Sequence, residues 1–583
     1  MAQLLAAAAQ GQIPGLVPLF QYQVFYYQDD LEIEPGAPMA FTGPVQANGN
    51  IYLGSDSLTF LSSVTAGGEI FEADGGASYF DVPPATNSAP FVLAGYPFIT
   101  NAYAILQAPP PGESPYTSPG NGRYYNSADM IVTISSNNAI SVTSGRLINN
   151  QATVINSNQW QLFLGTNGTF FDQRDNLPVS PVVLDVSNLV NWSATNNVLR
   201  PVLANWRGTG NADVQSIYVA DLRNFTNSVA TGTYTNITTN TGTNITITTN
   251  LVTNTTLTYL YGTNMVPMLP SGSPPPYTPF PPYLSITFIT NPPAQVETIY
   301  TVSFYAITKS IVSITNYYPI YFTNTFTNYA LELTGQPGIV LSNGAVLPPN
   351  GLSVATPDPA YIVGNWNIKT TFTGASDAGL SDTSHTLPSA IFADAITILS
   401  PAWNPTNSVL PVVGRIATND TVNAAFFAGN VPSFDTEYSG GLENFPRLLE
   451  KWSGYTLTWN GSMCCMFQSQ IANAPYPGTG VVYLPPTRNW AFDANFNNLG
   501  GLPALTPFVE KLVPSIQSVA ETNGTIYLSL NTWPGANYTL QYTTNLALGN
   551  WESLSSFVAT AICSTVSDLA TNSQRFYRLR SSP

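Results

Sequence analysis

The sequence predicts an all-β protein with a β-solenoid-like body, a strand-rich insertion, a C-terminal immunoglobulin-like β-sandwich and few short helices. Three observations support this fold class. Charged residues make up only 8% of the 583 residues, whereas hydrophobic residues make up 44%. Residues that favour pleated strands (Thr, Val, Ile, Tyr and Phe) recur in short runs. Asn, Gly and Pro, which favour turns, separate these runs.

The N-terminal segment, 1–40, is predicted to hold the remnant of a helix and then a strand. The Ala- and Leu-rich run from Leu4 to Ala9 is typical of a helix end, and it lacks the basic start of a signal peptide. Apolar and acidic residues alternate strictly at 31–34, which is the pattern of a strand.

The predicted solenoid-like body has two parts, 41–205 and 336–512. Short apolar runs, each ended by Gly, Asn or Ser, fill 45–71 in the first part and 338–399 in the second. Runs of this length suit the coils of a β-solenoid. An ordinary β-sandwich is the alternative, because the coils have no exact sequence period.

One short helix is predicted near 442–452, late in the second part of the body. Apolar residues recur there at the spacing of one helical face. These residues are Leu442, Phe445, Leu448, Leu449 and Trp452.

Between the two parts of the body lies a predicted Thr/Asn- and Pro-rich β insertion, 206–335. Thr and Ile alternate with Asn through 225–262, a pattern typical of extended hairpins or a stalk. Strong β-propensity without charge also favours the addition of such strands to a neighbour. Prolines crowd 270–283, which predicts polyproline II.

The C-terminal segment, 513–583, is predicted to be a small immunoglobulin- or fibronectin-like β-sandwich. Its strand-like runs are 525–530, 538–542, 551–554 and 575–579, with Gly and Asn between them. Short strands at this spacing are what such a sandwich requires.

The charge of the chain excludes nucleic acid as a partner. The net charge is −16, from 16 basic and 32 acidic residues, and no Lys or Arg precedes Arg123. Nucleic-acid binding depends on clustered basic residues, so no nucleic-acid partner is expected. No apolar run is long enough for a transmembrane helix. A surface of amides and hydroxyls is cheap to desolvate, which favours a homo-oligomer or homopolymer.

The three cysteines allow two interpretations. Cys464 and Cys465 are adjacent and Cys563 is distant. A disulfide from the pair to Cys563 and buried free thiols are both compatible with the sequence. No CxxC spacing predicts a zinc site, and no nucleotide or hydrolase motif is present, so no cofactor, metal or catalytic residue is predicted.

A single histidine provides the one grouping that resembles a catalytic site. His385 follows Asp377 and Asp382, and Asp394 comes soon after. Carboxylates with a histidine can perform acid–base catalysis on polysaccharides. Isolated aspartates in Gly/Ser loops more often cap turns, and that interpretation is preferred.

Two further groups of residues are candidate sites. The acidic residues Asp29, Asp30, Glu32 and Glu34 could bind calcium, but alternation divides them between two strand faces, and edge charges are the preferred interpretation. Sequons for N-glycosylation include Asn236, Asn244, Asn254 and Asn537, as expected by chance from this composition.

Parts of the chain resemble PilX-like, pilus-assembly-associated surface proteins of Verrucomicrobia and related bacteria. The segments that carry the resemblance are 25–36, 43–53, 351–364 and 438–447. The tail, with Tyr538, Trp551 and Phe576, resembles C-terminal sandwich modules of exported proteins of the same bacteria. The resemblance implies export and a structural role at the cell surface, and it supplies no catalytic residues. The chain departs from pilins because it lacks their long N-terminal hydrophobic helix.

The sequence thus predicts a non-enzymatic, extracellular or cell-surface structural subunit that assembles through strand edges and neutral polar or aromatic surfaces. A carbohydrate-binding adhesin is the first alternative, because the tyrosines between Tyr116 and Tyr125 could stack on surface glycans. A β-helix polysaccharide-degrading enzyme, centred on Asp377 and Asp382, is the second.

Overall fold

A computed structural model describes most of the chain. The described residues are 16–55, 57–72, 78–94, 102–117, 119–148, 151–240, 255–259, 299–303, 320–369, 376–433, 439, 441–476, 480–511, 515–532, 537–546, 549–560, 563–569 and 574–582. Side chains are not described within 227–332. The predicted helix remnant and the proline-rich segment 270–283 lie outside the described residues.

The expected all-β fold with few short helices is confirmed. Strands dominate every part of the described chain. Its α-helices are α2 (Tyr124–Ser127), α3 (Ser157–Trp160), α4 (Val186–Thr195) and α5 (Leu199–Arg207). None of the helices in the described ranges has the length and hydropathy that crossing a membrane requires.

An eleven-stranded sheet forms the largest face of the body. From β12 to β8 all neighbouring strands run parallel, and β13 and β14 extend the sheet antiparallel at one edge. Its order is β14 (Gln151–Val154), β13 (Ile140–Ile148), β12 (Met130–Ile134), β18 (Ser216–Asp221), β24 (Leu352–Ala355), β26 (Ser389–Phe392), β29 (Ala425–Asn430), β32 (Met463–Gln468), β2 (Val24–Tyr26), β5 (Val45–Ala47) and β8 (Val64–Ala66).

Smaller parallel stacks form the other faces of the body. One sheet contains β15 (Leu164–Gly165), β17 (Leu177–Asp185), β23 (Gln336–Ser342), β25 (Ala360–Val363), β27 (Ile396–Leu399) and β30 (Pro446–Leu448), with β16 (Phe170–Asp172) against β17. Another contains β28 (Asp420–Asn423), β31 (Thr456–Gly461) and β33 (Thr487–Phe492). The chain visits these faces in turn, which is how the coils of a solenoid are built.

The N-terminal residues form the most regular coils. Strands on one face begin at residues 24, 45 and 64, and on the next face at 31, 51 and 70, so a coil takes roughly 20 residues. The second and third faces are β3 (Leu31–Ile33), β6 (Ile51–Leu53) and β9 (Ile70–Glu72), and β4 (Met39–Phe41), β7 (Leu58–Phe60) and β10 (Tyr79–Phe80).

The order of strands in the stack differs from their order in the chain. The N-terminal strand β2 pairs in parallel with β32, and Val24 is opposite Met463. The backbone N–H of Met463 donates to the carbonyl of Gln23 at 2.7 Å. The N-terminal coils therefore stack beyond the C-terminal coils, whereas β12 lies toward the other end of the sheet.

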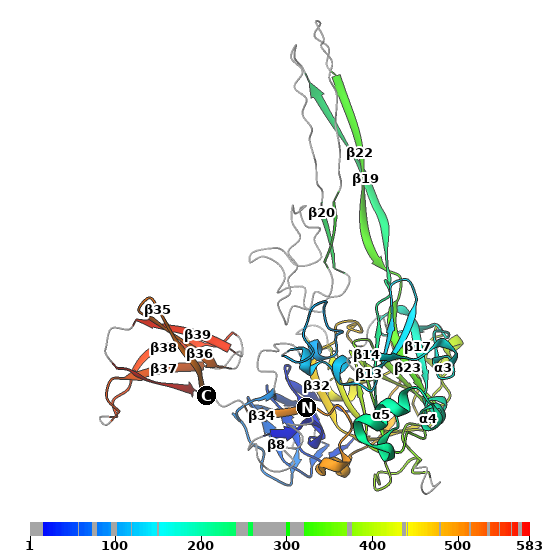
Figure 1. Ribbon diagram of the computed structural model, residues 1–583, viewed down its shortest axis with the longest axis horizontal. Coiled ribbons are helices and arrows are strands. Elements are labelled where there is room, and N and C mark those ends of the chain that lie inside the picture. Colours follow the sequence, from blue (N-terminus) through cyan, green and yellow to red (C-terminus); the bar gives the residue numbers. More distant parts are fainter. Residues whose placement is uncertain are drawn as a thin grey trace.

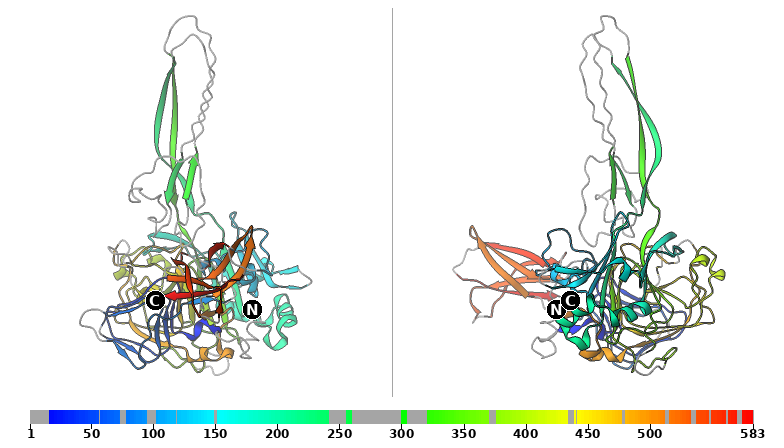
Figure 2. Two further views of the ribbon diagram at one scale, coloured as in Figure 1. Left: turned by 90° about the vertical axis from the view of Figure 1, so that its left-hand side faces the viewer. Right: turned by 45° about the vertical axis from the view of Figure 1, so that its right-hand side comes forward.

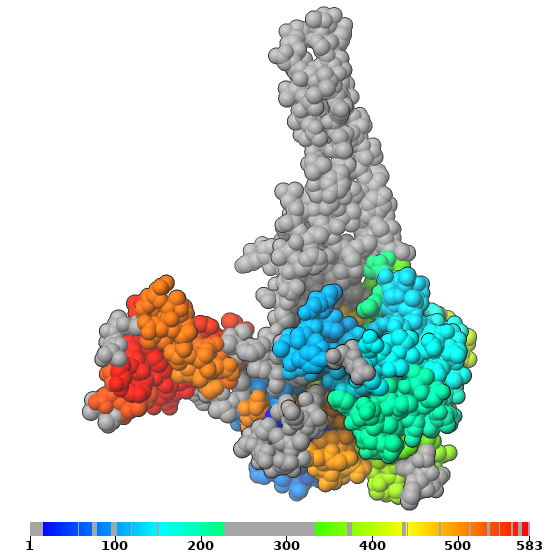
Figure 3. All heavy atoms as spheres, viewed as in Figure 1, coloured from blue at the N-terminus to red at the C-terminus, as the bar shows by residue number. Residues whose placement is uncertain are grey.

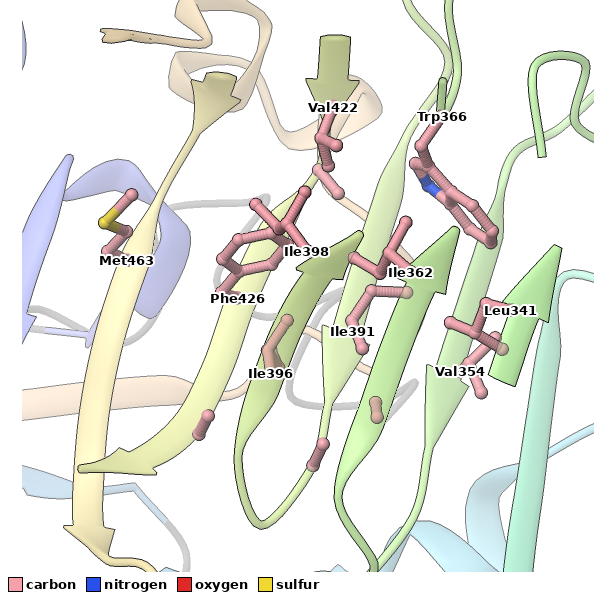
Figure 4. Packing of buried hydrophobic residues seen from close by; sticks show 14 of the residues in the cluster. Leu341, Val354, Ile362, Trp366, Ile391, Ile396, Ile398, Val422, Phe426 and Met463 are labelled. Atoms are coloured by element: carbon pink, nitrogen blue, oxygen red, sulfur yellow. The ribbon is translucent and has the colours of Figure 1, made fainter. Parts of the chain in front are cut away.

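Apolar side chains from all faces fill the interior of the stack. Figure 4 shows Ile362, Ile391, Ile398 and Phe426 pointing toward one another from neighbouring strands. The outer face of the eleven-stranded sheet is covered as well, by a layer that includes a small sheet of β1 (Leu16–Pro18), β34 (Phe508–Lys511) and β11 (Phe91–Leu93). A parallel sheet buried on both faces explains why its strands are apolar throughout.

Buried asparagines line one corner of the interior. The Asn423 side chain donates to the Asn367 carbonyl at 3.0 Å, and Asn460 donates to the Asn423 side-chain oxygen at 2.8 Å. All three are almost fully buried. Each stacked amide supplies both a hydrogen-bond donor and an acceptor, so the polar groups of one coil pair with those of the next.

The long hairpin leaves the body after β18, which is a central strand of the main sheet. The insertion that the sequence places at 206–335 therefore begins later, at β19 (Thr226–Asn240). This strand pairs antiparallel with β22 (Ile320–Leu333), and β20 (Thr255–Tyr259) pairs with β21 (Ile299–Ser303). Figures 1 and 2 show β19 and β22 projecting from the body.

The C-terminal module consists of two three-stranded antiparallel sheets. One contains β35 (Ser515–Thr522), β36 (Thr525–Asn531) and β39 (Cys563–Leu569), and the other β38 (Glu552–Val558), β37 (Asn537–Thr543) and β40 (Phe576–Ser582). Leu528, Leu530 and Leu540 join the two sheets in a small core. Figure 3 shows the module, in orange and red, beside the body.

The helix predicted near 442–452 is wrong. The structure has a 3-10 turn, η8 (Leu442–Asn444), followed by strand β30, in which Pro446 is opposite Ile396. The five apolar residues of the predicted face are all buried. An amphipathic helix needs one exposed face, and this segment has none. The edge of β27 is available for pairing, so the segment forms a further parallel strand instead.

Replacing Asn423 by alanine should destabilise the body. The change removes the two hydrogen bonds that the Asn423 side chain makes in the buried ladder, one to the Asn367 carbonyl and one from the Asn460 side chain, which should lower the free energy of unfolding by ~1–3 kcal/mol. Urea denaturation measures the change, with Asn497→Ala at an exposed position as the control. Equal stability of the two variants would contradict a structural role for the ladder.

Candidate functional site

The loop before β26 brings together two residues of the grouping that resembles a catalytic site. The Nδ1 atom of His385 lies 3.7 Å from Oδ2 of Asp377, and the histidine side chain is half exposed. Asp382 is exposed and accepts a hydrogen bond from the backbone N–H of Ser384 at 2.9 Å. Its pKa is lowered chiefly by that bond. Asp382 thus caps a turn, as expected for an aspartate in such a loop.

Asp394 does not join this group. It follows β26, whereas His385 precedes that strand, so the two residues lie at opposite ends of β26. Asp394 is fully buried, and its carboxylate accepts hydrogen bonds from the backbone N–H groups of Ile471 and Ala472 at 3.0 and 2.8 Å. The residue therefore secures the loop after β32.

The acidic residues at 29–34 also have separate partners. Asp29 accepts from the Gln468 side chain at 2.8 Å, and Asp30 accepts from the backbone of Asn50 at 2.7 Å. Glu32 accepts from the hydroxyl of Ser433 at 2.7 Å. Within the described residues no group of three or more His, Cys, Asp or Glu side chains is placed to hold a metal ion.

A polar cavity of about 240 Å³ lies beside the histidine loop, and no sequence motif marks it. Its lining residues are Thr386, Leu387, Pro388, Asp493, Asn495, Asn498, Gly500 and Gly501. The buried Asp493 carboxylate accepts from the Thr386 hydroxyl at 3.1 Å and from the Asn495 backbone at 3.0 Å. The density of asparagines after Asp493 is the one pattern that could have suggested it. Amides and hydroxyls around a small hollow suit a neutral, polyhydroxylated ligand.

The tyrosines between Tyr116 and Tyr125 do not form a common stacking surface. Tyr116 is 77% exposed, but Tyr124 is buried and packs against Phe392 with ring centroids 4.5 Å apart. Tyr125 packs against Tyr218. An exposed pair lies elsewhere: the rings of Tyr52 and Phe71 stack on the outside of β6 and β9, 5.0 Å apart.

The adjacent cysteines are buried free thiols. They point to opposite faces of β32, so that Cys465 packs in the interior and Cys464 in the outer layer. Burial raises the pKa of both thiols, which keeps them protonated and unreactive. The side chain of Cys563 lies outside the described residues.

Several buried carboxyl groups hold their protons more tightly than usual. Burial raises the pKa of Asp29 and Asp394 to about 6, and the pKa of Asp420 and Glu450 to about 7. One oxygen of Asp420 is buried without a hydrogen-bond partner. These groups belong to the framework of the stack, so their strong perturbation does not mark a catalytic centre.

Comparison with protein-family models, curated proteins and solved structures finds no match to this chain.

The buried carboxyl groups should make the protein less stable as the pH rises from 4 to 7. Each group releases its proton near pH 4 when unfolded but only near pH 6 to 7 when folded, so the folded chain binds more protons across this interval. The expected result is a free energy of unfolding that falls with rising pH, measured by urea denaturation at intervals across the range.

Replacing Asp420 by asparagine should flatten this dependence. The variant should gain stability over the unmodified protein at pH 7.5, on the order of 2 kcal/mol, and show much less gain at pH 5. Glu521→Gln, at an exposed position, is the matched control. An identical pH dependence in the Asp420 variant would show that this carboxyl is ionised in the folded protein.

Proposed function

We propose that the protein is an exported, non-enzymatic structural subunit of a cell-surface or extracellular filament. The observation that carries the proposal is the body itself: a continuous stack of short parallel strands with very few charges. Successive coils of this stack are hydrogen-bonded to one another through the eleven-stranded sheet, which favours a rigid body. The resemblance to surface proteins of Verrucomicrobia and related bacteria points the same way.

The long hairpin provides a further reason for a role in assembly. Among the described residues, β19 and β22 pair only with each other. The two strands contain one charged residue, Glu332. Charges and prolines are the usual protection of an open edge, and their scarcity favours pairing with another chain.

The residues on which the enzyme alternative depends support it poorly. His385 has one carboxylate beside it, Asp377, while Asp382 and Asp394 each bind backbone amides of a turn. A polysaccharide-cleaving site needs two carboxyl groups facing one bond. His385 lies beside Asp377, and Asp382 acts on the histidine through its charge while its carboxylate caps a turn.

Purified protein should therefore assemble. Negative-stain microscopy and sedimentation velocity over a range of protein concentrations should detect linear particles whose mass grows with concentration. Dispersed monomers at every concentration and salt level tested would contradict the proposal.

A second candidate function, carbohydrate binding, is favoured by the polar cavity. Its amides and its size of about 240 Å³ fit a sugar unit, and Tyr52 and Phe71 present exposed aromatic rings on another face. A glycan array should identify ligands. Filling the cavity by Asn498→Trp should abolish that binding, whereas Asn497→Trp, whose neighbouring position does not line the cavity, should leave it intact. Equal binding by both variants would place the ligand elsewhere.

A further inference from the structure

The two ends of the stack are built differently. At the β12 end, α4 and α5 connect β17 to β18 and insert Leu189, Leu199 and Leu203 into the same core that fills the coils. The antiparallel strands β13 and β14 extend the main sheet at this end. Helices and hairpin together close it, as terminal caps of repeat proteins do. We call this the capped end.

The opposite end, formed by β8, β9 and β10, has no such cap among the described residues. The edge of β8 is paired with the segment 85–88, because Ala85 exchanges backbone hydrogen bonds with Val64 and Ala66 and the N–H of Ser88 donates to the Ala66 carbonyl. In contrast, β9 and β10 are each the last strand of their sheets among the described residues. The core residues Ile70 and Phe80 are only partly buried here, and Phe71 is 46% exposed. We call this the open end.

Aromatic ladders run up to the open end and stop there. Phe41, Phe60 and Phe80 stack with centroids 4.9 and 5.0 Å apart, and Tyr52 stacks on Phe71. The last ring of each ladder belongs to the last coil, so no further coil of the described chain covers its outer side. Strand edges and apolar rings that end without a neighbour are features of an interaction surface.

Negative charge surrounds the open end. Glu69, Glu72 and Asp81 are exposed on and beside its last strands. No Lys, Arg or His occurs in the chain before Arg123, so the N-terminal coils carry no cation of their own. The Lys511 ammonium, from β34, contacts this region by donating to the Ser88 hydroxyl at 3.4 Å.

The capped end presents the opposite charge together with apolar surface. Arg200 is partly exposed on α5, and no ion pair of the described residues includes it. Trp206 is 59% exposed, with the Arg146 guanidinium 5.1 Å from its ring centroid. Arg146 and Arg207 share one fully buried carboxylate, Asp129, while Asp213 is buried beside Arg207 and Asp185 caps α4. Arg200 is therefore the basic side chain of this end that is left for a neighbouring copy.

We infer that the open end of one copy docks on the capped end of the next copy. Acidic groups and unpaired strands of the first then face Arg200 and Trp206 of the second. Figure 1 shows β8 and α4 on opposite sides of the body, so the same contact can repeat from copy to copy. A contact between two different surfaces that repeats without closing generates a polar filament.

Docking of two open ends on each other is the competing arrangement. It would place Glu72 and Asp81 of one copy near the same residues of the other, and like charges facing each other disfavour an interface. The inference rests on the proposed filament function and adds its direction: every subunit points the same way.

Charge reversal at each end tests the contact. One variant carries Glu72→Arg with Asp81→Arg at the open end, and a second carries Arg200→Glu at the capped end. Sedimentation velocity should show each variant alone assembling only at concentrations about fivefold or more above those of the unmodified protein, as like charges then meet at the interface. An equimolar mixture should recover assembly, because the acidic capped end of one variant meets the basic open end of the other.

Glu521→Arg and Arg580→Glu, exposed positions in the C-terminal module, are the matched controls and should assemble normally. Thermal melts verify that every variant is folded. Normal assembly of Arg200→Glu, with assembly of the open-end variant restored by unmodified protein, would indicate contact between two open ends and overturn the inference. Normal assembly of all variants would overturn it while leaving the filament function standing. Monomeric unmodified protein would overturn both.

Discussion

The structure depends on one interaction above all, the parallel backbone hydrogen bonds between β2 and β32. Three residues of β2 are in register with Met463, Cys464 and Cys465, and the N–H of Tyr27 donates to the Cys465 carbonyl at 2.8 Å. No short loop connects β2 and β32, because the two strands lie at distant points of the chain. The N-terminal coils hold their position through this pairing and through the interior apolar contacts on either side.

The scarcity of charge in this chain has a structural counterpart in its interior. The body buries amides in an ordered row, formed by Asn367, Asn423 and Asn460. Hydrogen bonds from coil to coil pair their polar groups. A buried amide costs far less than a buried charge when it is hydrogen-bonded. The buried acids that remain, such as Asp394, cap turns through backbone amides. A neutral composition thus suits the inside of the stack.

Short strands could be read from the sequence because alternation and turn residues are local signals. Leu31 and Ile33 are buried as their pattern predicts, and the strands of 390–399 appear as β26 and β27. The order of the strands in the stack could not be predicted, because no local sequence pattern indicates that β2 pairs with β32. A helix was wrongly predicted at 442–452 because apolar residues can fall at helical spacing wherever every side chain of a segment is buried. The cavity at Asp493 depends on two distant loops, so no single motif records it.

The permuted order of the coils has a consequence for how the chain acquires its structure during synthesis. Strand β2 leaves the ribosome well before the strand on which it stacks, because β32 is made more than four hundred residues later. Until then β2 has one free edge, and its coils lack the neighbour that buries their base. The N-terminal coils are thus fixed late, because a contact of such high sequence separation forms slowly and leaves strand edges exposed until it does.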